Sequence, residues 1–151
     1  MAVPNELKKI ALTRLKTAKI LIDASDWDGA AYMLGYALEC ALKAAICKSL
    51  RLTAYPDTVK DGPIRTFFAT HKFDQLLVVS GLQDIFNAAG NVDCFRHWSE
   101  FTVEYPGDWP SMRYNLGRMN QFDEKKARAL HANLTDPQHG VLTTIKRKRR
   151  W

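Results

Sequence analysis

The segment from Trp27 to Leu50 constrains the fold more than any other part of the chain. It has the apolar pattern of a long helix and carries very few charges. A helix that is apolar around most of its circumference must be surrounded by other elements, so we expect it to be the central and most buried helix. Small residues such as Ala30, Ala31 and Gly35 allow a second helix to approach it closely. Its apolar positions are Ala30, Ala31, Leu34, Leu38, Ala41, Leu42, Ala45 and Ile46.

The preceding segment, from Glu6 to Ser25, predicts an amphipathic helix. Its apolar positions recur at steps of three and four, and its lysines occupy other faces. The Ser25-Asp26 joint is short, so this helix and the central one are expected to be antiparallel neighbours. The apolar positions are Leu7, Ala11, Leu15, Ala18 and Ile22.

The remainder of the chain predicts shorter helices separated by two loops. Residues 51–70 contain two prolines and no sustained period, which indicates a loop. Thr70 is expected to cap a helix over 71–80 that Gly81 ends. Helical pieces follow at 82–89 and at 92–101, the second with Phe95, Trp98 and Phe101 on one face.

The last third begins with a proline-bounded loop. Residues 105–110 contain two prolines and are expected to deliver Arg113 and Tyr114 on an irregular or extended segment. A helix resumes near 121–123 and runs to about 133, and Asp136-Pro137 is expected to start the final one. No segment has a convincing period-two pattern. We therefore predict an all-α, up-and-down bundle of five to six helices.

The positive charge of the chain is concentrated at its C-terminus. There are 22 Lys and Arg against 16 Asp and Glu, a formal net charge of +6. Without the run Lys146, Arg147, Lys148, Arg149 and Arg150 the counts become 17 and 16. We accordingly divide the chain into a single helical domain, 1–145, and a basic tail, 146–151. Five successive cations can attract RNA phosphates, although a solvated helix end favoured by the helix dipole is the simpler interpretation.

Several classes of protein are not expected. No apolar run approaches the roughly 20 uninterrupted residues of a membrane-spanning helix, and the N-terminus lacks the pattern of a secretory signal. The three cysteines, Cys40, Cys47 and Cys94, are expected to be buried free thiols in a cytoplasmic protein. The four histidines are scattered and no Cys-x-x-Cys pair occurs, so we predict neither a metal site nor a cofactor.

Three motifs resemble one known family. The string Gly35-Tyr36, Glu39-Cys40 and Leu42-Lys43 in the central helix closely resembles the core of the HEPN domain, the "higher eukaryotes and prokaryotes nucleotide-binding" domain. Thr70-His71-Lys72-Phe73 is similar to the family's Thr-His start of its third helix. Trp109 and Arg113-Tyr114 resemble its late Trp and Arg-Tyr pair.

The resemblance implies a HEPN-type bundle that forms a homodimer with a cleft shared between protomers. Some members resemble ribonuclease toxins that use an Arg and a His separated by four to six residues, one pair from each protomer. Others lack the pair and look like modules that bind a nucleotide or a protein partner, often beside a minimal nucleotidyltransferase.

Arg65 and His71 have the ribonuclease spacing, with five residues between them. A His can move the 2'-hydroxyl proton while an Arg stabilises the charge on phosphorus. Two departures from the family weaken this interpretation. The family's motif lies on a late helix, and a polar residue such as Asn usually follows its Arg, where this chain has Thr66.

Six other residues are candidate ligand contacts. Glu39 and Lys43 are four apart, which suits a helical ion pair as well as a cleft. Tyr36 shares that face, although core packing is the more common role for its ring. Trp109, Arg113 and Tyr114 could stack on a base and hold a phosphate, or could attach the long loop to the bundle.

Three functions remain open from the sequence. The leading one is a HEPN module that binds nucleotide or RNA phosphate in a cleft and acts with a nucleotidyltransferase-type partner in a toxin-antitoxin-like system. The second is a metal-independent ribonuclease toxin using Arg65 and His71. The third is a purely structural dimerisation domain.

Overall fold

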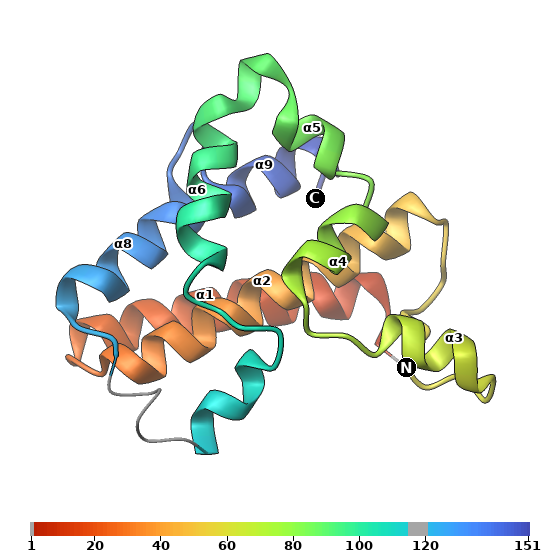
Figure 1. Cartoon of the computed structure of the whole chain (residues 1–151), viewed down its shortest axis with the longest axis horizontal. Coiled ribbons are helices and arrows are strands. Elements are labelled where there is room, and N and C mark those ends of the chain that lie inside the picture. The colour runs from red at the N-terminus through yellow and green to blue at the C-terminus, as the bar shows by residue number, and fades with distance from the viewer. Residues whose placement is uncertain (1, 115–120) are drawn as a thin grey trace.

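The structure, a computed structural model, describes residues 2–114 and 121–151, and the all-α prediction is confirmed for them. The two long helices, α1 (Pro4–Asp23) and α2 (Trp27–Ser49), lie antiparallel, and several of the shorter elements pack against α2 (Figure 1). No β-strand occurs within the described ranges. The shorter elements are α3 (Gly62–Phe68), α4 (Phe73–Val79), α5 (Gln83–Asn87), η1 (Ala89–Asn91), α6 (Val92–Thr102), η2 (Trp109–Tyr114), α8 (Glu124–Thr135) and α9 (Val141–Lys148).

The start of α2 is set by the residues that join it to α1. Ser25 has a φ of 63°, which reverses the chain direction. Asp26 then caps α2, because its carboxylate accepts a hydrogen bond from the backbone N–H of Gly29 at 2.9 Å. The predicted antiparallel pair is therefore confirmed, with α1 starting two residues earlier than expected.

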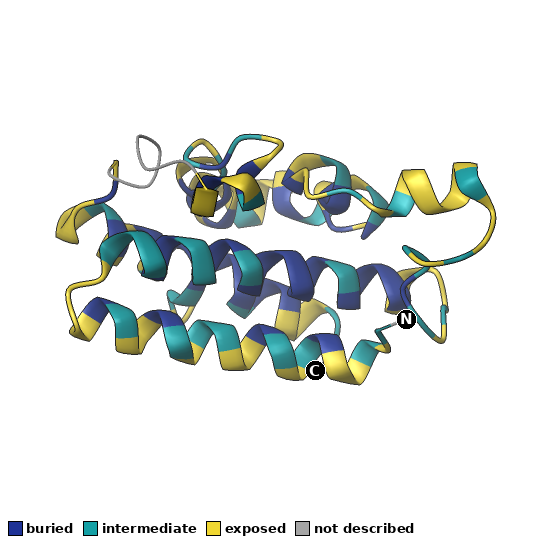
Figure 2. Ribbon diagram, turned by 90° about the horizontal axis from the view of Figure 1, so that it is seen from below, coloured by how far each residue is buried: buried dark blue, intermediate teal, exposed yellow. Residues whose placement is uncertain are grey.

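α2 is the core helix, as predicted. Its apolar positions are almost completely buried, whereas α1 exposes one side to solvent (Figure 2). By length and composition α2 alone among the helices of residues 2–114 and 121–151 could cross a membrane, contrary to our expectation of no such segment. However, 83% of that apolar window is buried inside the protein, as in the core helix of a folded domain.

Gly35 allows the 105–109 segment to lie directly against α2. A Cβ atom at this position would be 2.8 Å from Cε1 of Tyr105 and 3.0 Å from Cζ3 of Trp109. The Tyr105 hydroxyl also donates a hydrogen bond to the carbonyl of Ala31 at 2.6 Å. The absence of a side chain at Gly35 thus positions η2, which carries three of the candidate ligand residues.

Two segments expected to be irregular are helical. Residues 62–68 form α3, since Asp61 caps the backbone N–H of Ile64 at 2.9 Å and Pro63 occupies the first turn. Proline here starts a helix rather than preventing one. Residues 109–114 form the 3₁₀ helix η2, which tolerates Pro110 near its start. With α3, the described ranges hold eight α-helices, above the five to six expected, and η2 is a 3₁₀ helix in addition.

The predicted starts of two helices, α4 and α9, are also wrong. Thr70 does not cap α4, because its hydroxyl accepts the N–H of Lys72 in a turn and the helix begins at Phe73. Asp136 likewise accepts from the N–H groups of Gln138 and His139, so that α9 begins only at Val141. In both cases the side chain stabilises a turn that precedes the helix.

The face predicted for the 92–101 helix is partly wrong. Trp98 and Phe101 are buried, but the Phe95 side chain is 46% exposed. Phe95 therefore lies at the edge of the core, beside a cavity described below.

Candidate functional site

Glu39 is the centre of a group of polar side chains that we call the Glu39 cluster: Glu39, Lys43 and His71. Only 4% of Glu39 is exposed. Its Oε1 atom is 2.8 Å from Nζ of Lys43 and 2.9 Å from Nδ1 of His71. The sequence suggested the first contact but not the second, which joins residues 32 positions apart.

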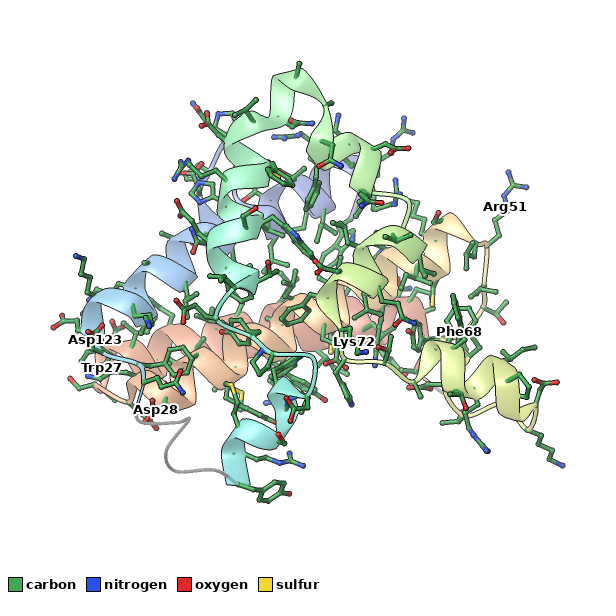
Figure 3. The ribbon with its side chains drawn as sticks, viewed as in Figure 1. Trp27, Asp28, Arg51, Phe68, Lys72 and Asp123 are labelled. Atoms are coloured by element: carbon green, nitrogen blue, oxygen red, sulfur yellow. The ribbon has the colours of Figure 1, made fainter. Side chains whose placement is uncertain are left out.

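Two aromatic side chains hold the backbone at His71 and at Phe68, three residues before it. The indole Nε1 of Trp109 donates to the His71 carbonyl at 3.1 Å. The Tyr55 hydroxyl donates to the carbonyl of Phe68 at 2.7 Å, and Nζ of Lys43 lies 5.0 Å from the centre of the Tyr55 ring. Phe68 and Lys72 mark the two ends of this connection between α3 and α4 (Figure 3). Tyr55 was missed because it lies where the sequence shows no periodicity.

The electrostatics of the Glu39 cluster keep Glu39 ionised. Burial by itself raises the pKa of the carboxyl group, but the hydrogen bond from His71 and the charge of Lys43 outweigh it, and the net effect lowers the pKa. Since Nδ1 of His71 faces a carboxylate, that nitrogen carries the proton. The other ring nitrogen is then available to a ligand, and the His71 side chain is 50% exposed.

The lowered pKa of Glu39 predicts a loss of stability in acid. A carboxyl group whose pKa is lower in the folded state contributes stability above its unfolded value of 4.5 and loses it as the pH falls through the folded value. We expect the free energy of unfolding, measured by denaturant titration, to decrease as the pH falls below 4.5. Glu39→Gln should make the free energy of unfolding less dependent on pH in this range. A pH profile identical to that of the wild type would contradict the prediction.

Arg65 belongs to α3 rather than to the Glu39 cluster. Its side chain is exposed on α3, a helix with no buried residue. Within the part of the chain that the structure describes, no hydrogen bond or ion pair joins Arg65 to His71. A single protomer thus presents the two predicted catalytic residues separately.

The late aromatic and arginine residues divide into a buried and an exposed part. Trp109 is fully buried, and its ring stacks on Phe73 with centroids 5.7 Å apart, which places it in the core rather than at a surface where it could stack on a base. Arg113 donates to the Tyr32 hydroxyl at 3.0 Å and lies 4.7 Å from the ring centre of Tyr114. Tyr114 is 80% exposed.

Tyr36 is half-buried on the side of α2 that faces Arg14. The guanidinium carbon of Arg14 is 5.6 Å from the centre of its ring. Burial raises the pKa of the Tyr36 hydroxyl, so the group remains a neutral donor at physiological pH. Among the described residues it makes no hydrogen bond to Glu39 or Lys43.

The C-terminal cations belong to a folded surface. Lys146, Arg147 and Lys148 form the last turn of α9. Arg149 donates to the Ser80 carbonyl at 2.7 Å, and its own carbonyl accepts from Nζ of Lys48 at 2.6 Å. The predicted boundary between the helical domain, 1–145, and the basic tail, 146–151, therefore falls inside α9.

We call this surface the basic patch. Its cations come from α1, α2 and the C-terminus, and in residues 2–114 and 121–151 none of them forms an ion pair with an acidic side chain. Lys8 lies 5.8 Å from the Trp151 ring, which joins α1 to it. The basic patch comprises Lys8, Lys48, Lys146, Arg147, Lys148, Arg149 and Arg150.

The remaining groups with reactive side chains are the cysteines and the possible metal ligands. Cys40, Cys47 and Cys94 are free and buried, as expected. Burial raises the pKa of the Cys40 thiol to about 11, which makes it a poor nucleophile. Outside the undescribed residues 1 and 115–120, no group of three or more His, Cys, Asp or Glu side chains is placed to hold a metal ion.

Comparison with known proteins gives one match. Residues 4–58 match the family model described as the HEPN domain. The matched range includes Tyr36, Glu39 and Lys43 but ends before Arg65, His71 and η2. No curated protein and no solved structure matches the chain.

Proposed function

Since the HEPN match over residues 4–58 supports a helical module with a nucleotide- or RNA-related role, we propose that this chain binds the phosphates of a nucleotide or RNA through His71 and the basic patch. The observation that carries the proposal is the state of His71. A buried carboxylate holds its Nδ1 atom at 2.9 Å, while half of the side chain remains open to solvent. The ring is thus fixed in orientation and still accessible.

The charge balance of the Glu39 cluster favours an anion. Lys43 already balances the buried carboxylate at 2.8 Å, so the cluster has no net negative charge that would repel an anion. A phosphate oxygen can accept a charge-assisted hydrogen bond from the imidazolium form of a His ring. The basic patch supplies further cations without acidic partners, and such cations release counterions when they bind RNA.

A homodimer and a nucleotidyltransferase-type protein partner are part of the same proposal, as are a cytoplasmic location and a toxin-antitoxin-like role. The HEPN resemblance is their basis. One feature of the surface supports a protein contact: α1 exposes two large apolar side chains, Leu12 at 44% and Ile20 at 59%. Exposed apolar side chains on a helix suit a helix from a second protomer.

The ribonuclease alternative draws on the same His71. A His oriented by a buried carboxylate is the arrangement that general acid–base catalysis uses. Arg65 would then have to come from the second protomer of a dimer, because its own chain presents it on the exposed helix α3. In the purely structural alternative, neither group would contact RNA.

Fluorescence anisotropy of a labelled single-stranded RNA at several salt concentrations tests the proposal. The triple variant Lys146→Gln, Lys148→Gln, Arg150→Gln is compared with the control Lys9→Gln, Lys16→Gln, Lys125→Gln, which removes the same charge from exposed sites elsewhere. Each phosphate contact in single strands contributes about 0.7 to the salt slope. We expect the patch variant to reduce the slope by about 2 and the control to leave it nearly unchanged.

His71→Ala tests the contribution of the Glu39 cluster. We expect weaker RNA binding at every salt concentration and an unchanged helical circular dichroism spectrum. RNA cleavage in EDTA is followed in parallel for the wild type, Arg65→Ala and His71→Ala. Cutting by the wild type that both variants abolish would establish the ribonuclease, whereas an absence of RNA binding by the wild type would leave the structural role.

A further inference from the structure

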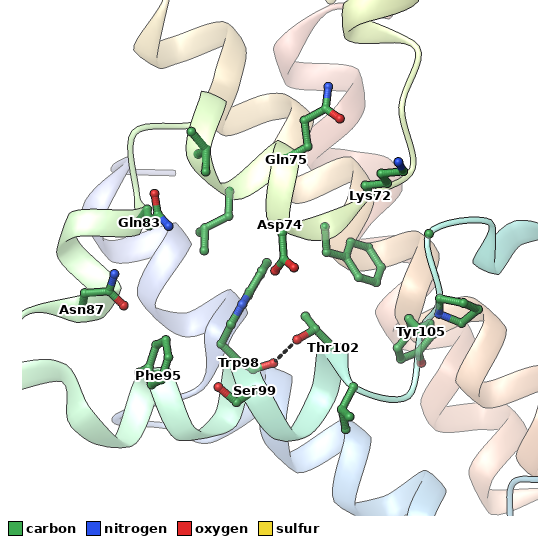
Figure 4. Close-up of a pocket in the computed structure, with 16 residues that line it drawn as sticks. Lys72, Asp74, Gln75, Gln83, Asn87, Phe95, Trp98, Ser99, Thr102 and Tyr105 are labelled. Carbon is green, nitrogen blue, oxygen red and sulfur yellow. Dashed lines mark hydrogen bonds between the residues drawn. The ribbon is translucent and has the colours of Figure 1, made fainter.

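A second candidate site is a cavity whose lining does not include the Glu39 cluster. It lies between α4, α5 and α6, is closed at one end by residues 105–107, and has a volume of about 950 Å³. It is open to solvent, and side chains from all three helices point into it (Figure 4). Cavities of this size that combine apolar walls with a few polar groups are typical of small-molecule sites.

The wall formed by α6 is aromatic. Trp98 lines the middle of the cavity, and Phe95 lies one turn earlier with 46% of its side chain exposed. Trp98 is held by an edge-to-face contact with Phe86, their ring centres 5.6 Å apart. The exposed ring of Phe95 is therefore a surface at this wall on which a planar ligand can stack.

The opposite walls supply polar groups of two kinds. From α4, the carboxylate of Asp74 points toward Trp98, and from α5 come the amides of Gln83 and Asn87 (Figure 4). These three side chains form no hydrogen bond or ion pair with another residue of the described ranges. Among the described residues that line the cavity, Lys72 is the only cation.

We propose that this cavity binds a guanine base, from either a free nucleotide or a single-stranded RNA. Guanine presents two adjacent N–H donors, at N1 and N2, which match the two acceptor oxygens of the Asp74 carboxylate. Its O6 and N7 atoms are acceptors, which match the amide N–H groups of Gln83 and Asn87. The ring stacks on Phe95, and Lys72 is placed to meet the phosphate.

Adenine fits the same groups poorly. Its Watson–Crick edge carries an acceptor at N1 beside a single amino group, so that one oxygen of Asp74 would face a lone pair. A site that hydrogen-bonds both donors of one base discriminates strongly against a base that lacks one of them. The inference deepens the proposed function, because it adds base preference to phosphate binding, but it uses different residues.

Binding of GMP and AMP, measured by isothermal titration calorimetry, tests the site. We expect the wild type to prefer GMP by roughly tenfold or more, as for a bidentate base contact. Asp74→Asn should abolish this preference. Asp84→Asn is the matched control, because Asp84 is an exposed carboxylate on the neighbouring helix α5 and does not line the cavity. Phe95→Ala should weaken both nucleotides, and thermal unfolding checks that each variant is folded.

A second arm separates the two sources of the base. Anisotropy is measured with a short single-stranded RNA that contains one guanine and with its adenine-substituted counterpart. Preference for GMP identifies a nucleotide site, and preference for the guanine RNA alone identifies an RNA site. Equal binding of the two bases in both arms, no binding in both, or a guanine preference that survives Asp74→Asn would overturn the inference. RNA binding that depends on the basic patch but shows no base preference would overturn the guanine site and leave the proposed function intact.

Discussion

Trp109→Ala is expected to lower the free energy of unfolding by about 3–5 kcal/mol, the usual cost of removing a buried aromatic ring. The Trp109 side chain is fully buried, and its ring lies 5.7 Å from that of Phe73 and 5.8 Å from that of Tyr105. The surrounding rings are themselves packed against α2, so the cavity left behind cannot close easily. Urea titration of wild type and variant measures the difference.

Two further variants show which property of Trp109 matters. Trp109→Phe keeps an aromatic ring but removes the N–H that donates to the His71 carbonyl at 3.1 Å. We expect it to cost less than the alanine variant and to weaken RNA binding, because the segment carrying His71 loses an anchor. Tyr114→Ala is the control from the same helix, 80% exposed, and should change stability by no more than about 0.5 kcal/mol. Equal stability of the Trp109→Ala and Tyr114→Ala variants would contradict the core role of Trp109.

Glu39→Ala is expected to be the second most damaging change, with a loss of about 3 kcal/mol. It leaves the Lys43 ammonium, whose side chain is only 12% exposed, without the carboxylate that lies 2.8 Å away. A buried charge that has lost its partner is costly, whereas an apolar pair of similar volume is not. The double variant Glu39→Ala, Lys43→Met should therefore be more stable than Glu39→Ala alone.

The complete double-mutant cycle, with Lys43→Met as the fourth protein, isolates the interaction between the two residues. We expect a coupling energy clearly above the few tenths of a kcal/mol of an exposed i,i+4 pair. A coupling energy within that small range would show that Glu39 and Lys43 behave as a solvated surface pair despite their burial. His71 is unchanged in all four proteins. Its contact with Glu39 is present in the two proteins that have Glu39 and absent from the two that carry Glu39→Ala, so it cancels from the coupling energy.

The long helices could be predicted because their pattern is strong and local. The apolar positions of α1 and α2 repeat over many turns, and Ser25-Asp26 marks the joint between them. The short helices are harder, since the residues that start a helix are also those of turns. Asp61 caps α3 where we expected a loop, and Asp136 holds a turn where we expected a helix.

Only one of the two contacts of Glu39 in the candidate site could be predicted from the sequence. Glu39 and Lys43 stand four apart on one helix, so their contact follows from helical geometry. The contact of Glu39 with His71 depends on how the α3–α4 connection folds back over α2, which no local pattern encodes. The burial of Trp109 likewise depends on Gly35, a residue from a distant helix.

The burial of α2 also has a consequence for the synthesis of the chain. The residues that match the HEPN model end at residue 58, whereas α2 is covered by α4, η2, α8 and α9, all of which emerge later from the ribosome. A nascent chain at that stage holds α1 and α2 with much of the apolar surface of α2 uncovered, a form that is prone to aggregation. Part of the surface of α2 therefore stays uncovered until α9 (Val141–Lys148), which packs against it, has been added.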